Sequence, residues 1–198
     1  PRSTLFPYTT LFRSHDRLWS SALYLNNGGE DILSIANDII WVNKDVAAKA
    51  RKNISQKTNI RPESIMITAT HTHSGPHIVD YISNQADSTV PKADQNYVNF
   101  MQDCIIQAGI KAYQNAQPAK LGLAIANDTG VGTNRRNPNG PADHNVPVLL
   151  VKNAETNANI ACMLVCSMQP TVIHEDSTLV SGDFPGLARP YLQKNILE

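Results

Sequence analysis

Two histidines separated by a single residue, His71 and His73, are the leading candidates for chemistry in this sequence. They follow an apolar run and precede the turn-forming Ser74-Gly75-Pro76. Imidazole ligates metal ions and exchanges protons near neutral pH. If the backbone stays extended through the pair, both rings project to one face, because side chains alternate along a strand. One metal ion or one substrate would then meet both rings, although two polar residues that merely end a strand would give the same pattern.

A strand at residues 65–70 is predicted to position these histidines, because this run is largely apolar and β-branched. Its composition is typical of a strand buried on both faces. In open α/β sheets, ligands collect at the carboxyl ends of the strands, where the histidines lie. A second apolar run, residues 160–168, ends in the same way at Gln169-Pro170. We therefore expect two buried strands that each end in polar residues.

The other elements follow from periodicity and turn signals. We predict strands at 18–25, 31–36, 120–126 and 146–151, helices at 43–58, 94–115 and 185–195, and a polar loop over the site at 77–92. Glycines between the first two strands predict a tight hairpin turn, and Asp183 or Ser181 is expected to cap the last helix. This order predicts a mixed α/β fold, with a mixed β-sheet, flanking helices and peripheral hairpins.

Composition excludes several classes of function. The chain has 198 residues, a formal net charge of zero and 41% hydrophobic residues, so it shows no basic excess of the kind that binds nucleic acid. No apolar run approaches the roughly 20 residues that cross a bilayer, which leaves peripheral membrane contact open. Cys104, Cys162 and Cys166 lack metal-ligand spacing, and the last two are expected to be buried thiols. Nothing in the composition indicates an oligomeric state.

The first residues require separate treatment. Residues 4–14 resemble the translation of a common sequencing adapter, and the alternative is an aromatic edge strand that contains a proline. The adapter interpretation makes residues 1–14 an artefactual segment and residues 15–198 a partial catalytic domain, truncated from a larger one. Under that interpretation, no leader segment can be judged.

Four motifs in order carry a family resemblance: residues 70–76, Asn134-Arg135-Arg136, residues 168–171 and residues 181–186. Together they resemble the neutral/alkaline (non-lysosomal) ceramidase N-terminal domain family, and His15-Asp16 resembles the early segment of that family. The resemblance extends from His15 nearly to the end of the chain.

The resemblance implies a zinc-dependent amidohydrolase that cleaves the N-acyl amide of a small lipid, ceramide, into a sphingoid base and a fatty acid. A Lewis acid assists this reaction because an amide carbonyl resists attack by water. His71 matches the first zinc ligand of the family. His73 matches a catalytic position that assists by hydrogen bonding or proton transfer. Arg135 matches a site arginine that could stabilise oxyanion charge, whereas without the resemblance Arg135-Arg136 is typical of a solvated loop.

Gln169 departs from the family pattern, which has a histidine there as the second zinc ligand. A neutral amide is a poor zinc ligand beside imidazole. Three explanations stay open. A read error could have changed the codon, a divergent protein could use Gln169 weakly or use His174 instead, or the metal could have been lost.

Two classes of function remain. The first is a zinc amidohydrolase that acts on ceramide-like lipids, with His71 and Gln169 as the metal positions and His73 and Arg135 as the catalytic positions. The second is a divergent, non-catalytic binding or interaction module; a metal-dependent hydrolase of another amide or ester is a weaker third. The remaining ligands of the family are expected downstream of Glu198, so we expect residues 15–198 alone to be inactive.

Overall fold

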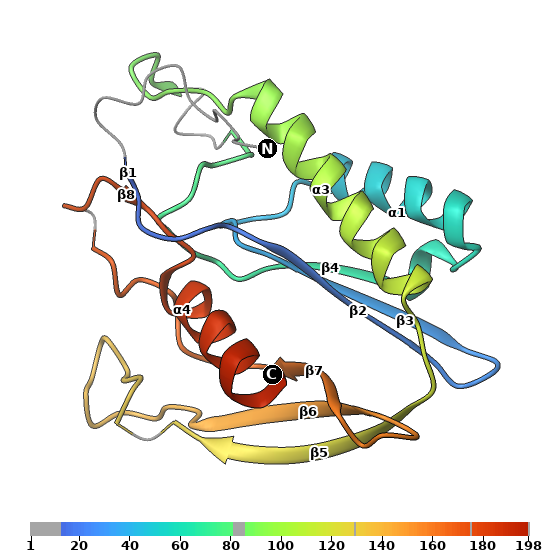
Figure 1. Ribbon diagram of the computed structural model, residues 1–198. Helices are drawn as coiled ribbons and strands as arrows, with labels where there is room; N and C mark the ends of the chain where they lie inside the picture. Colours follow the sequence, from blue (N-terminus) through green and yellow to red (C-terminus); the bar gives the residue numbers. More distant parts are fainter. Residues whose placement is uncertain (1–12, 81–85, 129, 175, 198) are drawn as a thin grey trace. The chain divides into compact units, whose positions relative to one another are not determined.

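The computed structural model describes residues 13–80, 86–128, 130–174 and 176–197 (Figure 1). The strands are β1 (Arg13–Ser14), β2 (Ser20–Asn26), β3 (Asp31–Asn37), β4 (Ile65–Ala69), β5 (Ala119–Asn127), β6 (Asn145–Asn153), β7 (Asn159–Leu164) and β8 (Leu179–Val180). The helices are α1 (Lys44–Thr58), α3 (Gln95–Gln114) and α4 (Asp183–Leu192), with a 3-10 turn η1 (Pro62–Ser64) and a π-helical turn η2 (Gln193–Leu197). The predicted mixed α/β fold is confirmed.

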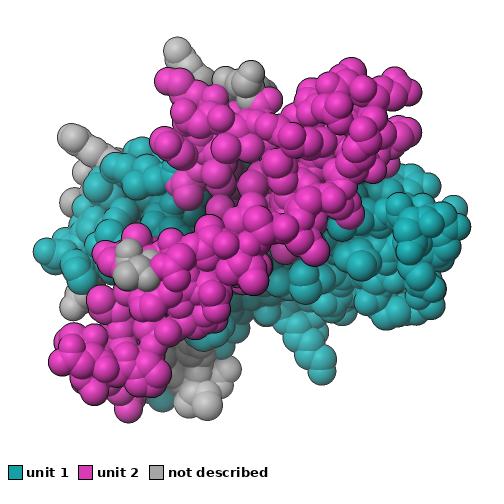
Figure 2. Space-filling view, turned by 90° about the horizontal axis from the view of Figure 1, so that it is seen from below, with its two compact units in different colours: residues 1–115, 170–187 teal, residues 116–169, 188–198 magenta. Residues whose placement is uncertain are grey.

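The chain divides into two compact units (Figure 2). The first comprises residues 1–115 and 170–187, and the second comprises residues 116–169 and 188–198. The first unit contains a three-stranded sheet in the order β2-β3-β4 and the short parallel pair of β1 with β8. The second contains an antiparallel sheet in the order β5-β6-β7.

The hairpin of β2 and β3 turns where the sequence predicts. Gly28 adopts a φ of +89°, which is accessible to glycine, and its amide donates to Asn26 Oδ1 at 2.8 Å. The two strands then pair in antiparallel register from Asn26 opposite Asp31 to Ser20 opposite Asn37. This register places Leu33 and Ile35 of β3 on one face of the sheet.

Helix α1 connects β3 to β4, which pair in parallel. Asn43 caps its first turn by accepting the amide of Asp45 at 2.8 Å, and Asn59 ends it with a left-handed φ of 61°. Asp94 caps α3 in the same way, through the amide of Asn96. Both helices therefore begin at side chains whose oxygens satisfy otherwise unpaired backbone amides.

The core of the first unit lies between the sheet and the helices α1 and α3, which cover the same face in Figure 1. Its fully buried members include Leu33, Ile35, Ile54, Ile65 and Ile105. The opposite face of the sheet is open, since Ile32 is 56% and Met66 is 47% exposed. The prediction that the strand before the histidines is buried on both faces is therefore wrong, because helices cover it on one face only.

Three further predictions need correction. Strand β7 ends at Leu164, four residues earlier than the apolar run, and it is half-buried throughout. Cys162 and Cys166 are likewise half-buried rather than buried, and Cys166 lies beyond the strand. Helix α4 begins at Asp183 itself, two residues before the predicted start.

Several predictions fall partly or wholly outside the described residues. The adapter-like residues 4–12 are among them, whereas Arg13 and Ser14 form β1. The proposed domain limits stay a prediction. The polar loop at 77–92 is described only in part, and its described residues form no strand. Among the described helices, none has the length and hydrophobicity that a bilayer crossing requires.

Candidate functional site

The two histidines lie where β4 ends, as predicted, but the backbone does not stay extended. His71 has a left-handed φ of 69°, and its amide donates to Ile39 O at 3.1 Å. The chain therefore turns at His71, and alternation no longer predicts where the rings point. The rings still meet, with centroids 5.0 Å apart and planes at 86°.

The ring of His71 is fixed by its surroundings. Nδ1 lies 2.8 Å from the carbonyl oxygen of Ile40. A carbonyl oxygen only accepts, so Nδ1 carries a proton, and in the neutral ring Nε2 then carries the lone pair. The ring of Trp41 packs edge to face against it, with centroids 4.5 Å apart. A histidine that donates one ring nitrogen to a backbone carbonyl presents the other nitrogen as metal-ligating histidines do.

A buried carboxylate holds the residue that precedes His71. Asp38 is 2% exposed and accepts the amide of Trp19 at 2.9 Å through Oδ2. Its Oδ1 accepts the hydroxyl of Thr70 at 3.3 Å, and the amide of Thr70 donates to Asn37 O at 2.8 Å. Asp38 therefore positions the backbone from which His71 projects.

Replacing Asp38 by asparagine is expected to lower the free energy of unfolding by about 1–3 kcal/mol, because the new amide places a donor against donors. Urea denaturation followed by tryptophan fluorescence measures this, since Trp19 and Trp41 are the two tryptophans and both belong to the first unit. Asp103→Asn, at an exposed position on α3, is the matched control. Equal stability of the two variants would contradict the assigned role of Asp38.

A second group of buried residues ties the histidine loop to the segment before α4. Thr72 is fully buried, and its hydroxyl donates to Ser181 O at 2.8 Å. The amide of Ser181 donates to Ser74 O at 2.8 Å. The two bonds fix the loop on both sides of His73, which is itself exposed.

Asp16 joins this segment to the start of the described chain. It accepts the hydroxyl of Ser181 in a short hydrogen bond, the amide of Gly182 at 2.8 Å and Nδ1 of His15 at 2.9 Å. Burial raises the pKa of Asp16, but these hydrogen bonds outweigh it and hold the pKa below its usual value. Asp183, which is 1% exposed, similarly accepts the amides of Ile173 and Phe184 at 2.9 and 2.7 Å.

The other two predicted site residues contact each other within the second unit. Arg135 Nη2 donates to Gln169 Oε1 in a short hydrogen bond. The amide oxygen through which Gln169 would ligate a metal therefore accepts a bond from a cation. Asn134 shapes the loop at Arg135, because its Oδ1 accepts the amides of Arg136 and Asn137 at 3.0 and 3.1 Å.

The base of this loop is closed by Asp128, which follows β5, and His144, which precedes β6. Asp128 Oδ1 lies 2.9 Å from His144 Nδ1, and Oδ2 accepts a weak bond from Cys166 Sγ at 3.5 Å. Burial raises the pKa of the Cys166 thiol, and Asp128 adds to the increase. The thiol is therefore a poor nucleophile here.

The donor set fits part of a zinc site. His71 offers Nε2, and His73 lies beside it, whereas a catalytic zinc takes about three protein ligands and a water. Within the described ranges, no cluster of three or more His, Cys, Asp or Glu side chains is arranged to hold a metal ion. His174, the alternative ligand, is exposed.

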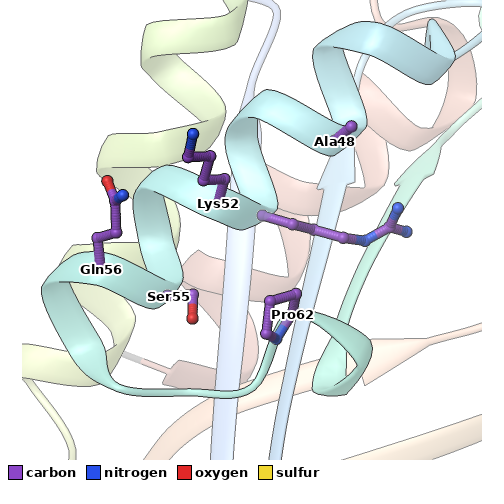
Figure 3. Close-up of a pocket in the computed structure, with 6 residues that line it drawn as sticks. Ala48, Lys52, Ser55, Gln56 and Pro62 are labelled. Atoms are coloured by element: carbon purple, nitrogen blue, oxygen red, sulfur yellow. The ribbon is translucent and has the colours of Figure 1, made fainter.

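One open hollow of about 400 Å³ lies elsewhere, on α1 and η1 (Figure 3). Its lining includes Lys52, Ser55 and Pro62. The turn η1 precedes β4, and the histidines follow β4. The hollow and the histidines are therefore separated along the chain by the five residues of β4, which span about 16 Å when extended. The hollow therefore takes no part in the histidine site.

Sequence reasoning missed the roles of Asp16 and Asp38 as hydrogen-bond acceptors. Asp16 lies within a quoted motif, His15-Asp16, which is a usable signal. The sequence around Asp38 gave no signal, because a carboxylate at the end of a strand is ordinarily solvated. Trp41 and the carbonyl of Ile40 were also missed, since their role depends on the turn at His71.

Comparison with known proteins gives the fold. The crystal structure of the neutral ceramidase from Pseudomonas aeruginosa matches with a TM-score of 0.79 and 22% identity, over 94% of this chain and 31% of that chain. A ceramidase complexed with C2 matches with a TM-score of 0.74 and 17% identity, over 95% of this chain and 34% of that chain. No protein-family model and no curated protein matches the chain. The chain thus spans about a third of the length of these structures, and the predicted resemblance is confirmed for the fold, which is that of part of a neutral ceramidase.

Proposed function

We propose that the chain is part of a zinc-dependent amidohydrolase that cleaves the N-acyl amide of ceramide-like lipids. The observation that carries this proposal is the hydrogen bond from His71 Nδ1 to Ile40 O, which presents Nε2 beside His73 in a fold shared with neutral ceramidases. The likeness of fold makes a ceramide-like substrate the first choice among amides. The proposal covers the hydrolytic activity, the ceramide-like substrate and the zinc ion.

The residues have separate roles in this proposal. His71 would hold the zinc through Nε2, and zinc would polarise the amide carbonyl and activate water. His73 is exposed beside it and can exchange a proton at a ring nitrogen. Arg135 would stabilise negative charge on the substrate oxygen through its guanidinium. In the structure, that guanidinium donates to Gln169, so substrate would have to compete for it.

A second candidate function rests on the same hydrogen bond. With its oxygen bonded to Arg135, Gln169 has a role that needs no metal. A family member that lost the metal would retain the hydrogen bond between Arg135 and Gln169 for its structural role. The chain would then act as a binding or interaction module.

Zinc titration of the chain and of a Gln169→His variant separates the two candidates. We expect weak zinc binding by the chain and an affinity about 10- to 100-fold higher in the variant, because imidazole is the better zinc ligand. A chelator competition assay measures both affinities. Gln169→Asn, which retains an amide, is the matched control and should not gain affinity.

Two outcomes of the titration would each contradict a part of the proposal. If neither the chain nor Gln169→His binds zinc, the non-catalytic candidate is favoured. If the chain binds zinc tightly and the variant gains nothing, position 169 is not a ligand position. Because residues 15–198 alone are expected to be inactive, binding of an N-acyl sphingosine by the zinc-loaded variant, measured by equilibrium dialysis, tests the substrate class.

A further inference from the structure

The segment of residues 181–183, which leads from β8 into α4, is buried throughout. Ser181 is fully buried, and Asp183 is 1% exposed. Connecting segments ordinarily run over the surface, where water satisfies their backbone polar groups. Here protein groups do so instead, because the amide, the carbonyl and the hydroxyl of Ser181 all form hydrogen bonds. The segment therefore bonds to distant parts of the chain, and the proposed function assigns it no role.

Ser181 holds the histidine loop through both of its backbone groups. Its carbonyl oxygen accepts the hydroxyl of Thr72 at 2.8 Å, and its amide donates to Ser74 O at 2.8 Å. The Thr72 hydroxyl also accepts the amide of Ser74 at 3.2 Å. Two bonds to Ser181 and one bond within the loop therefore restrain the backbone on both sides of His73.

Asp183 holds a second loop, residues 170–174, which begins directly after Gln169. Its Oδ2 accepts the amide of Ile173 at 2.9 Å, and its Oδ1 accepts the amide of Phe184 at 2.7 Å. Asp183 adopts a left-handed φ of 58°, which is uncommon for a residue with a side chain. Such a conformation persists only where the surrounding contacts stabilise it, and it is frequent at functional sites.

Further contacts fix the 181–183 segment itself. The Ser181 hydroxyl donates to Asp16 in a short hydrogen bond and accepts the amide of Asp183 at 2.9 Å. A Cβ atom at Gly182 would lie 2.9 Å from a Cα atom of α4, a distance too short for a side chain. All of these contacts lie within the first unit. The segment is therefore bonded to Asp16 and packed closely against the start of the helix.

We propose that the 181–183 segment is a common anchor that sets the position of His73 relative to the loop of residues 170–174. Ser181 and Asp183 are then positioning residues, because each acts through the loop that it holds. The inference rests on the proposed function, in which His73 exchanges a proton and position 169 supplies a metal ligand. Catalytic groups must be held within about 0.5 Å of their working geometry, and a segment that bonds to both loops fixes the spacing between them.

Backbone order parameters from ¹⁵N relaxation test the anchor in the metal-free chain, with EDTA present. We expect about 0.85 at His73 and at Ile173 in the unmodified chain, which is the value of rigid backbone. Thr72→Val removes the hydroxyl and keeps the shape of the side chain. It should lower the order parameter of His73 below about 0.6 and leave that of Ile173 unchanged. Thr72→Ser retains the hydroxyl and should restore the value at His73.

Thr58→Val is the matched control for this variant. Thr58 is 3% exposed, and its hydroxyl donates to Ile54 O at 2.9 Å and accepts the amide of Ile60 at 3.3 Å. The control therefore removes a similar pair of hydrogen bonds at the end of α1. We expect it to lose stability in urea without a change in the order parameter of His73. An equal fall at His73 in both valine variants would overturn the proposal.

Ser181→Ala tests whether the two loops share one anchor. The variant loses the hydrogen bonds of the hydroxyl with Asp16 and Asp183, and it retains both backbone bonds to the histidine loop. We expect the order parameters of His73 and Ile173 to fall together, to values between about 0.6 and 0.85. A fall at one residue only, or at neither, would overturn the shared anchor. This variant decides the proposal if Thr72→Val does not fold.

Zinc titration separates a failure of this proposal from a failure of the proposed function. A chain that binds no zinc but shows the expected losses of order would contradict the zinc hydrolase and support the anchor. A chain that binds zinc, and in which His73 keeps its order in Thr72→Val, would contradict the anchor alone.

Discussion

Replacing His71 by alanine is expected to lower the affinity of the chain for zinc by about 100-fold or more. Loss of a supporting residue around a metal typically costs 10- to 100-fold, and loss of the ligand itself costs at least as much. The reason lies in the bond from Nδ1 to Ile40 O, which aims Nε2 outward. Competition with a chromophoric chelator measures the affinity. Trp41 provides a second signal, since its ring contacts that of His71.

His174→Ala is the matched control for this prediction, because it removes an exposed histidine from the segment that follows Gln169. We expect it to leave zinc affinity unchanged. The reverse result, in which His174→Ala weakens binding and His71→Ala does not, would transfer the ligand role to the alternative residue. Such a result would contradict the metal position at His71 and leave the fold untouched.

Replacing Asp16 by asparagine is expected to destabilise the first unit by about 1–3 kcal/mol at neutral pH. The carboxylate accepts three hydrogen bonds, from Ser181, Gly182 and His15, and bonds to a charged acceptor are the stronger kind. An amide in its place turns one acceptor into a donor. Urea denaturation followed by tryptophan fluorescence measures the loss, with Asp176→Asn at an exposed position as control.

The same variant has a defined pH dependence. Because the pKa of Asp16 is lower in the folded chain than its ordinary value of 3.8, its contribution to stability is present above that value. The contribution is lost as the pH falls below 3.8 through the folded pKa. The stability difference between the unmodified chain and Asp16→Asn should therefore narrow below about pH 3.8. A difference that is constant from pH 7 to pH 2 would contradict the assigned hydrogen bonds.

The regular elements were largely predictable from the sequence because their signals are local. The apolar spacing of α3 and its cap at Asp94, and the glycine turn before β3, identify those elements without tertiary context. The end of β7 was not predictable, because an apolar run continues past Leu164 although the ladder with β6 stops there. The exposure of Met66 was not predictable either, because the sequence of a strand does not indicate which of its two faces a helix will cover.

The candidate site was predictable as a set of residues but not as a geometry. The pair of histidines at a strand end was visible in the spacing. The turn at His71 was not, because it depends on carbonyls of Ile39 and Ile40, about thirty residues away in the chain. The contact between Arg135 and Gln169 was hidden for the same reason. The roles proposed for these four residues stay predictions until metal binding and hydrolysis are measured.

The uneven distribution of buried side chains has a consequence for cooperativity. All described apolar residues that are buried belong to the first unit, except Val151. Amide hydrogen exchange reads such differences region by region, because protection follows the cost of local opening. Amides of β3 will then exchange only when the core opens, whereas those of β5 that do not pair with β6 exchange almost freely. A single midpoint from a melting curve therefore describes β3 and its neighbours, and says little about the sheet that carries β5.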